Sequence, residues 1–184
     1  MNIKLGKILG IDIYINYSWI IIFLLVMWTF FSYLNTLNIA ATTGLKLASS
    51  FIYSILFFAS LLLHELSHSY VAKKNNIEIK NITLFLFGGV ANIEREPDNP
   101  KVELLMAIAG PLMSVILGFI YLGISYLIPQ KIFNLTFFNL GIINIFLAVF
   151  NLIPGFPLDG GRVLRAIIWL YSKNIKKWQR PLWF

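Results

Sequence analysis

The sequence contains no cysteine, which excludes disulfide bonds and any metal site built from thiolates. Charged residues are scarce as well: they make up 12% of the chain, about half the share found in an ordinary soluble domain. Hydrophobic residues make up 58%, so too few polar groups remain to cover a soluble globule. The abundance of aromatic residues, 16%, excludes a disordered chain. Together these proportions predict an integral membrane protein, and the length predicts a single unit over residues 1–184.

The formal net charge of +7 raises the question of a nucleic-acid partner. The basic residues, however, form no stripe beside stacking aromatic side chains, which is the usual footprint of such proteins. We therefore expect no nucleic-acid partner and expect the lipid bilayer to be the main surrounding of the chain. The sequence carries no signal of an oligomeric state.

Four apolar stretches are long enough to cross a bilayer, near residues 17–34, 49–70, 104–128 and 135–153. A soluble protein could bury one such helix all round. Four of them, with almost no amphipathic helix to cover them, could not be buried in a chain of this size. The predicted fold class is therefore an all-α polytopic membrane protein with about four transmembrane helices.

Two short segments have the pattern of strands instead. Apolar and polar residues alternate around Ile11, Ile13 and Ile15, which predicts a short N-terminal strand at the membrane surface. Residues 81–93, NITLFLFGGVANI, are rich in β-branched and aromatic residues around a Gly-Gly pair. This composition favours a membrane-associated β-hairpin.

The distribution of lysine and arginine predicts the orientation in the membrane. Basic residues gather before the first span, in residues 71–103 and in the tail, whereas residues 35–48 and 129–136 contain one lysine each. Segments rich in lysine and arginine stay in the cytoplasm. We therefore expect a multi-pass protein of the cell membrane with both termini and the 71–103 segment on the cytoplasmic side.

The chain has two histidines, His64 and His68, and both lie in the sequence HELSH within the second span. Positions four apart lie on one face of a helix, so the two imidazoles can hold one Zn²⁺, with Glu65 placed to take a proton from water. The alternative is that these side chains are merely packed within the bundle. Ionisable groups in an apolar helix are costly and need a compensating partner, which a metal ion provides. HELSH thus predicts a metal site.

Two imidazoles and a water leave a zinc site one protein ligand short. Asp159 ends the last apolar run, in FNLIPGFPLDGGR, and the predicted topology places it on the same side of the membrane as HELSH. The alternative role for Asp159 is that of a cap or turn residue before Gly160 and Gly161. Because HELSH is present, Asp159 is the best-placed third ligand, and this end of the bundle is the expected active-site face.

Asn144 and Asn151 lie seven residues apart on the fourth span and would stack on one face of that helix. They could bind the backbone of a substrate or polarise a carbonyl group. Hydrogen bonding between helices is an equally good explanation from the sequence alone.

These motifs, in this order, resemble those of the site-2 proteases, which are intramembrane zinc metalloproteases. The resemblance is carried by HELSH in an apolar helix, the Gly-Gly hairpin segment, AGP at 109–111 and NLIPGFPLDGGR. It covers most of the chain, from the N-terminal strand to Arg165, and is closest to the archaeal and sporulation-type branch. Members of that branch usually continue with further transmembrane helices after the LDG helix, so the resemblance leaves two alternatives: a truncated catalytic core, or a member in which the last two spans are absent by nature.

The resemblance also implies roles for individual residues. His64, His68 and Asp159 match the zinc ligands of the family, and Glu65 matches its catalytic glutamate. Asn151 matches the asparagine that opens the LDG motif. Gly88 and Gly89 fall in the segment that is thought to present a strand edge to an unwound substrate, by β-augmentation.

The predicted function is hydrolysis, with Zn²⁺ as cofactor, of a peptide bond within or near a transmembrane segment of another membrane protein. One rival is a membrane metal transporter or channel, but transporters usually show related sites in two repeats, and the sequence has no internal repeat. The other rival is a non-catalytic membrane scaffold of the same fold. A substituted Glu65 or Asp159 would favour that rival, and both residues are present.

Overall fold

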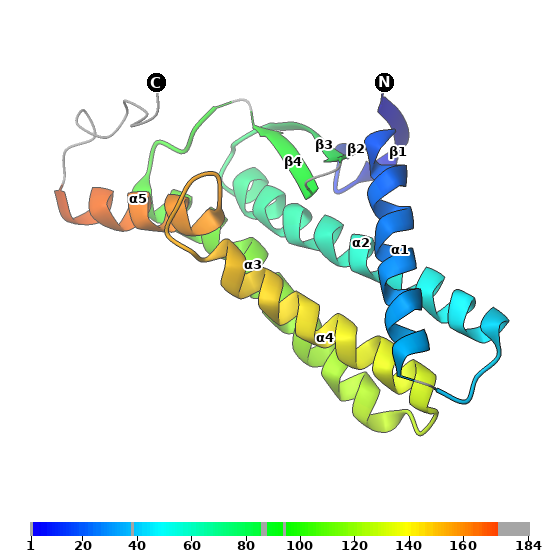
Figure 1. Cartoon of the computed structure of the whole chain (residues 1–184). Helices are drawn as coiled ribbons and strands as arrows, with labels where there is room; N and C mark the ends of the chain where they lie inside the picture. Colours follow the sequence, from blue (N-terminus) through cyan, green and yellow to red (C-terminus); the bar gives the residue numbers. More distant parts are fainter. Residues whose placement is uncertain (1, 38, 86–87, 94, 173–184) are drawn as a thin grey trace.

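The computed structural model describes residues 2–37, 39–85, 88–93 and 95–172. The basic residues of the tail beyond Ser172, which contribute to the predicted orientation, lie outside this described part. Four long helices form the body of the molecule, a small sheet lies across one end, and a fifth, shorter helix lies beside the start of the third (Figure 1).

The four predicted spans are confirmed as helices of sufficient length and hydropathy to cross a membrane. They are α1 (Ser18–Thr36), α2 (Thr43–Lys74), α3 (Pro100–Leu127) and α4 (Lys131–Asn151). Helix α2 is longer than the predicted span 49–70, because residues 43–48 extend its start and residues 71–74 extend its end. The Thr42 side chain caps its start by accepting a hydrogen bond from the Leu45 backbone N–H, and Lys73 and Lys74 occupy its last turn, where cations are favourable.

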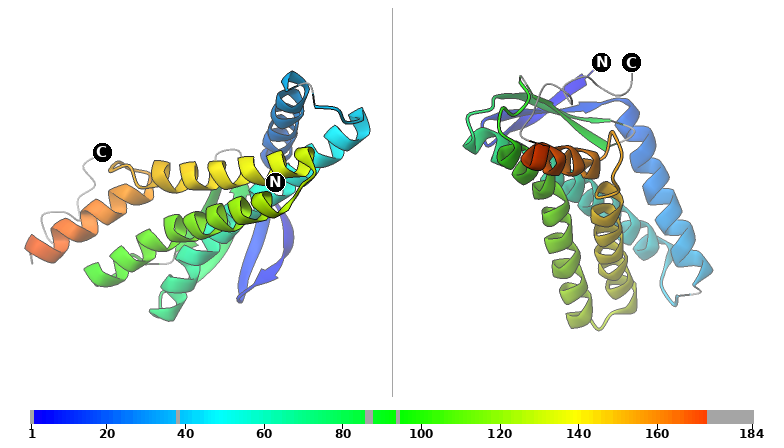
Figure 2. Two further views of the ribbon diagram at one scale, coloured as in Figure 1. Left: turned by 90° about the horizontal axis from the view of Figure 1, so that it is seen from below. Right: turned by 90° about the vertical axis from the view of Figure 1, so that its left-hand side faces the viewer.

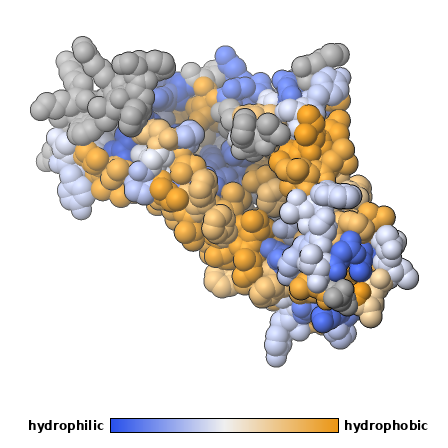
Figure 3. Space-filling model, in the orientation of Figure 1, coloured by the Kyte–Doolittle hydropathy of each residue, from blue (hydrophilic) through white to orange (hydrophobic). Residues whose placement is uncertain are grey.

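The surface of the bundle matches a lipid environment. Large apolar side chains are exposed on different helices, among them Trp28 at 68%, Phe119 at 64% and Phe146 at 62%. Figure 3 shows hydrophobic residues over the middle of the visible face and hydrophilic residues toward its ends. A membrane protein of this kind buries its helices against one another only in part, since lipid covers the rest.

The strands are more extensive than predicted and form one sheet of four, in the order β1-β2-β3-β4. They span β1 (Asn2–Ile8), β2 (Ile11–Asn16), β3 (Ile79–Phe85) and β4 (Gly88–Ile93). The predicted N-terminal strand is part of a hairpin, and β2 pairs in parallel with β3 from the predicted second hairpin. Within the described residues β4 has a neighbour on one side only, so it is an edge strand.

The sheet packs against α2 through a small apolar core. Ile11 and Ile13 of β2 and Ile82 of β3 contact Leu66, and all four are buried. Leu66 is the middle residue of HELSH, so the sheet rests directly on the turn of α2 that carries the motif. Figure 2 shows the sheet at the end of the bundle from two further sides. The same end of the bundle receives α5 (Asp159–Ser172), which contacts α3.

Candidate metal centre

The two histidines project from one face of α2 into the interior of the bundle. Their four-residue spacing brings the rings within 4.9 Å of each other, centroid to centroid. His64 is 4% exposed and His68 is 7% exposed. Two buried imidazoles side by side need partners for their ring nitrogens, since an unpaired buried polar group is costly.

Asp159 reaches the histidines because two glycines let the chain fold tightly in front of it. Asp159 is the first residue of α5, and the turn over residues 152–158 packs against the first turn of that helix. A Cβ at Gly160 would overlap the backbone carbonyl groups of Leu152 and Ile153, and one at Gly161 would lie 2.9 Å from the Gly155 backbone. The Gly-Gly pair thus permits the approach that places the aspartate.

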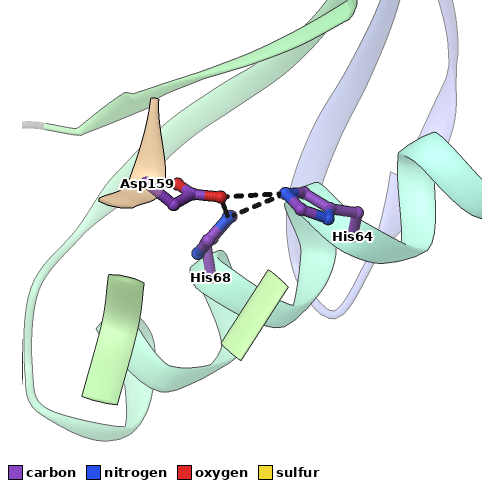
Figure 4. Close-up of side chains that lie close together, drawn as sticks. All are labelled: His64, His68 and Asp159. Carbon is purple, nitrogen blue, oxygen red and sulfur yellow. Dashed lines mark hydrogen bonds and ion pairs between the residues drawn. The ribbon is translucent and has the colours of Figure 1, made fainter. Parts of the chain in front are cut away.

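Three side-chain atoms converge at this point, as Figure 4 shows. Asp159 Oδ2 lies 3.1 Å from His64 Nε2 and 3.2 Å from His68 Nε2, and the two Nε2 atoms are 3.2 Å apart. The atoms form a nearly equilateral triangle. A tetrahedral zinc ion with bonds of about 2.0–2.2 Å has ligand atoms about 3.4 Å apart, so the triangle fits zinc with small adjustments.

The chemistry of the donor atoms also fits a cation. His68 Nδ1 donates a hydrogen bond to the Met106 backbone carbonyl at 2.6 Å, so the neutral ring has a lone pair on Nε2. That lone pair faces the carboxylate of Asp159, which is an acceptor too. His64 can supply at most one proton at its own Nε2, so at least one side of the triangle is an acceptor–acceptor contact. A metal ion at the centre would turn this repulsion into attraction.

Two contacts from α3 orient the imidazoles. The Met106 carbonyl fixes His68, and the Ser114 hydroxyl lies 2.9 Å from His64 Nδ1. Contacts of this type set the tautomer and direction of metal-binding histidines. The sequence alone does not point to Met106 or Ser114: a backbone carbonyl leaves no mark in the sequence, and a lone serine in an apolar helix is not distinctive.

Gly110 of α3 closes one side of the triangle. A Cβ at this position would overlap His68 Nε2 and would lie 2.6 Å from His64 Nε2. Only a residue without a side chain lets α3 pass so close to both imidazoles. The sequence AGP contributed to the family resemblance, but nothing in it pointed to this contact.

Glu65 lies between the triangle of His64, His68 and Asp159 and the edge strand. A Cβ at Gly89 of β4 would be 2.5 Å from Glu65 Cγ and 3.2 Å from its Cδ. The glycine therefore lets the strand lie directly against the glutamate. His68, Asp159 and Arg162 are all within electrostatic range of the Glu65 carboxyl group. Gly88 begins the same strand and pairs with Phe85.

The two asparagines of α4 make other contacts. Asn144 is buried, donates to the Leu140 carbonyl at 2.8 Å and lies 3.4 Å from the Ser60 hydroxyl of α2. Asn151 donates to the Leu147 carbonyl of its own helix at 3.0 Å. Among the described contacts neither asparagine touches the triangle, and a role for them toward a substrate stays a prediction.

Asp159 is ionised in this arrangement. Its burial would raise the pKa of the carboxyl group, but the two imidazoles beside it, His64 and His68, outweigh that effect and hold the pKa below its usual range. The charged form is the one that binds a metal ion.

Comparison with known proteins identifies the family. A sequence profile described as peptidase family M50 matches residues 52–135 and 128–181, which include HELSH and Asp159. The chain belongs to peptidase family M50. A solved structure, the site-2 protease from Methanocaldococcus jannaschii, superposes with a TM-score of 0.64 at 37% sequence identity, over 94% of this chain and 74% of that one.

Curated relatives agree with the M50 assignment. The protein sll0528 of Synechocystis is 42% identical over 181 residues, which is 96% of this chain and 46% of the relative. The zinc metalloprotease MJ0392 of M. jannaschii is 38% identical over 172 residues, 91% of this chain and 45% of the relative. Stage IV sporulation protein FB of Bacillus subtilis is 38% identical over 119 residues, 62% of this chain and 38% of the relative. The chain thus spans less than half the length of each of these relatives. Membership of the M50 family, together with relatives named zinc metalloproteases, implies Zn²⁺ as the metal.

Proposed function

We propose that this chain is the core of an intramembrane zinc metalloprotease, which hydrolyses a peptide bond within or near a transmembrane segment of another membrane protein. One observation carries the proposal: the triangle of His64, His68 and Asp159 lies beside Glu65 at the end of an apolar helical bundle. A metal transporter using the same ligands would have no role for a glutamate placed between the metal and an edge strand.

The residues divide the chemistry between them. Zn²⁺ held by His64, His68 and Asp159 would supply a Lewis acid that polarises the scissile carbonyl and lowers the pKa of a bound water. Glu65 accepts a proton from the attacking water and then delivers it to the leaving amine. Asp159 and the two imidazoles keep their donor atoms directed inward through the contacts described above.

The free edge of β4 offers a place where the backbone of a substrate could pair as an additional strand. A helical peptide shields its scissile bond with its own hydrogen bonds, so a transmembrane substrate must unwind before it is cleaved. An unwound segment can pair with the free edge of β4, where Gly88 and Gly89 lie and where Gly89 touches Glu65. Such pairing would bring the peptide backbone beside the proposed general base.

Water can reach this end of the bundle. A pocket of about 360 Å³ lies between α5 on one side and the end of β4 with the residues after it on the other, and its lining includes Asn92, Glu96 and Arg162. Arg162 is within electrostatic range of Glu65. Arg162 therefore connects this partly polar pocket to the surroundings of the proposed base.

Metal removal and replacement test the proposed function. The purified chain, reconstituted in liposomes with a library of fluorescently tagged transmembrane peptides, should cleave one or more of them. Cleavage should stop when phenanthroline removes the metal. After the chelator is washed out, it should return when about one equivalent of Zn²⁺ is added, because the three donor atoms form one site whose fourth position is open to water. Cleavage that continues without metal, or zinc-loaded protein that cleaves no peptide of the library, would argue against the proposal.

We also propose that the metal-binding end faces the cytoplasm, as the lysine and arginine distribution predicts. Single cysteines can test this cleanly, because the chain has none. Ala40 and Asp98 are exposed, and substituting them avoids the helix caps Thr42 and Asn99. Ala40→Cys should react with an impermeant thiol reagent in intact cells, and Asp98→Cys only after the membrane is opened. The reverse pattern would mean that the bundle is inverted.

A further inference from the structure

The third donor atom of the triangle depends on an element that is far from the others in sequence. Asp159 is 95 residues from His64, and it stands at the start of a helix of 14 residues that follows an irregular turn. His64 and His68, by contrast, share one rigid turn of α2. The relative position of α5 and the rest of the bundle therefore decides whether the triangle is closed.

A buried ion pair joins α5 to α3. Arg165 Nε donates to Glu103 Oε1 at 2.7 Å, and Arg165 Nη2 forms an ion pair with the same oxygen. Glu103 is 1% exposed, which is rare for a carboxylate and costly unless it is paired. The arginine fork offers two donors in a fixed geometry, so this contact restricts the orientation of α5 as well as its distance from α3.

The pair lies within two helical turns of Met106 on α3 and of Asp159 on α5. Glu103 precedes Met106 by three residues, and the Met106 carbonyl accepts the hydrogen bond of His68. Arg165 follows Asp159 by six residues on α5. We infer that Glu103 and Arg165 are a positioning pair, which holds Asp159 against His64 and His68 and so sets the affinity of the site for zinc. The inference rests on the proposed zinc site but needs no assumption about the substrate.

A second carboxylate on the same arginine provides an internal control. Glu96 Oε2 lies 3.3 Å from Arg165 Nη1, but its side chain is 77% exposed. An exposed ion pair of this kind contributes little, because water solvates both partners. The positioning effect should therefore belong to Glu103 and not to Glu96.

Zinc affinity, measured by competition with a chelator of known affinity, tests the inference without any substrate. Glu103→Gln keeps the shape of the side chain and removes its charge. It should weaken zinc binding by about 10-fold, the lower end of the cost of losing a group that hydrogen-bonds a metal ligand directly, because Glu103 acts on Asp159 through Arg165. Arg165→Lys should also weaken binding, because lysine cannot form the fork. Glu96→Gln should change the affinity by less than about twofold.

Thermal melting of the zinc-free protein separates positioning from a general structural role. If the pair only stabilises the fold, Glu103→Gln will lower the melting temperature of the zinc-free protein and leave zinc affinity unchanged, and the inference is then wrong. If Glu103→Gln fails to fold, the double variant Glu103→Arg/Arg165→Glu decides, since the exchanged pair should recover both fold and zinc affinity. A folded double variant with zinc affinity no better than that of Arg165→Lys would overturn the inference as well. Failure of the proposed function can be told apart from failure of this inference, because the parent protein would then bind zinc normally but cleave no peptide.

Discussion

Replacing Glu65 with glutamine should lower the rate of peptide hydrolysis by about 10²- to 10⁴-fold, the usual contribution of a general base. Glutamine has nearly the same shape as glutamate but cannot accept the proton of the attacking water. The carboxyl group belongs to none of the three converging donors, so zinc binding and the fold should be retained. The expected result is therefore a well-folded, zinc-loaded protein that is almost inactive.

The measurement combines metal analysis with initial cleavage rates on one reconstituted peptide. Glu78→Gln is a suitable control, because Glu78 is exposed beyond the end of α2. It removes the same charge and should leave the rate unchanged. A Glu65→Gln variant that cleaves at the parental rate would refute the role of Glu65, whatever the metal content.

Gly110→Ala should prevent zinc binding almost as completely as the loss of a ligand. The added methyl group would occupy the space of His68 Nε2 and lie 2.6 Å from His64 Nε2, so at least one imidazole has to turn away. Elsewhere in a helix the same change is favourable by up to about 1 kcal/mol, because alanine is the better helix former. A loss of zinc in Gly110→Ala would therefore be caused by the close approach of α3 to the two imidazoles and not by a weakened helix.

Gly123→Ala is the matched control for this variant. Gly123 lies on the same helix, and a Cβ there would have nothing within 4 Å. Gly123→Ala should bind zinc like the parent, whereas Gly110→Ala should resemble His68→Ala. Stoichiometric zinc in Gly110→Ala would mean that the helices separate more easily than their packing indicates, and the role given to Gly110 would be wrong.

The parts of the structure that the sequence predicts depend on local patterns. The spans follow from long uncharged runs, and the side-by-side placement of His64 and His68 follows from a spacing of four on a helix. The placement of Asp159 needed one further step, the counting of membrane crossings, which brings two distant segments to one side. Each of these inferences uses either the pattern within one segment or the number of membrane crossings between two residues, since an even number returns the chain to the same side.

The remaining features depend on how distant segments meet. The pairing of β2 with β3 crosses two transmembrane helices, and no pattern within either strand encodes it. The contacts of Met106 and Gly110 involve a backbone carbonyl and an absent side chain. The pairing of Glu103 with Arg165 joins a charged residue in the first turn of α3 to one in the middle of α5, and each resembles an ordinary solvated helix residue. Such features follow from packing, which hydropathy and spacing do not determine.

The separation between His64 and Asp159 has a consequence for biosynthesis. The ribosome delivers α2, with both imidazoles and Glu65, long before it delivers α5. A nascent chain that has inserted its first three spans holds two of the three converging donor atoms. Its Glu103 has no ion pair with Arg165 yet, because α5 has not been synthesised. The triangle can close only after α4 has crossed the bilayer and the turn before Asp159 has folded. The order of synthesis therefore keeps the partly inserted protein from holding the complete set of donor atoms.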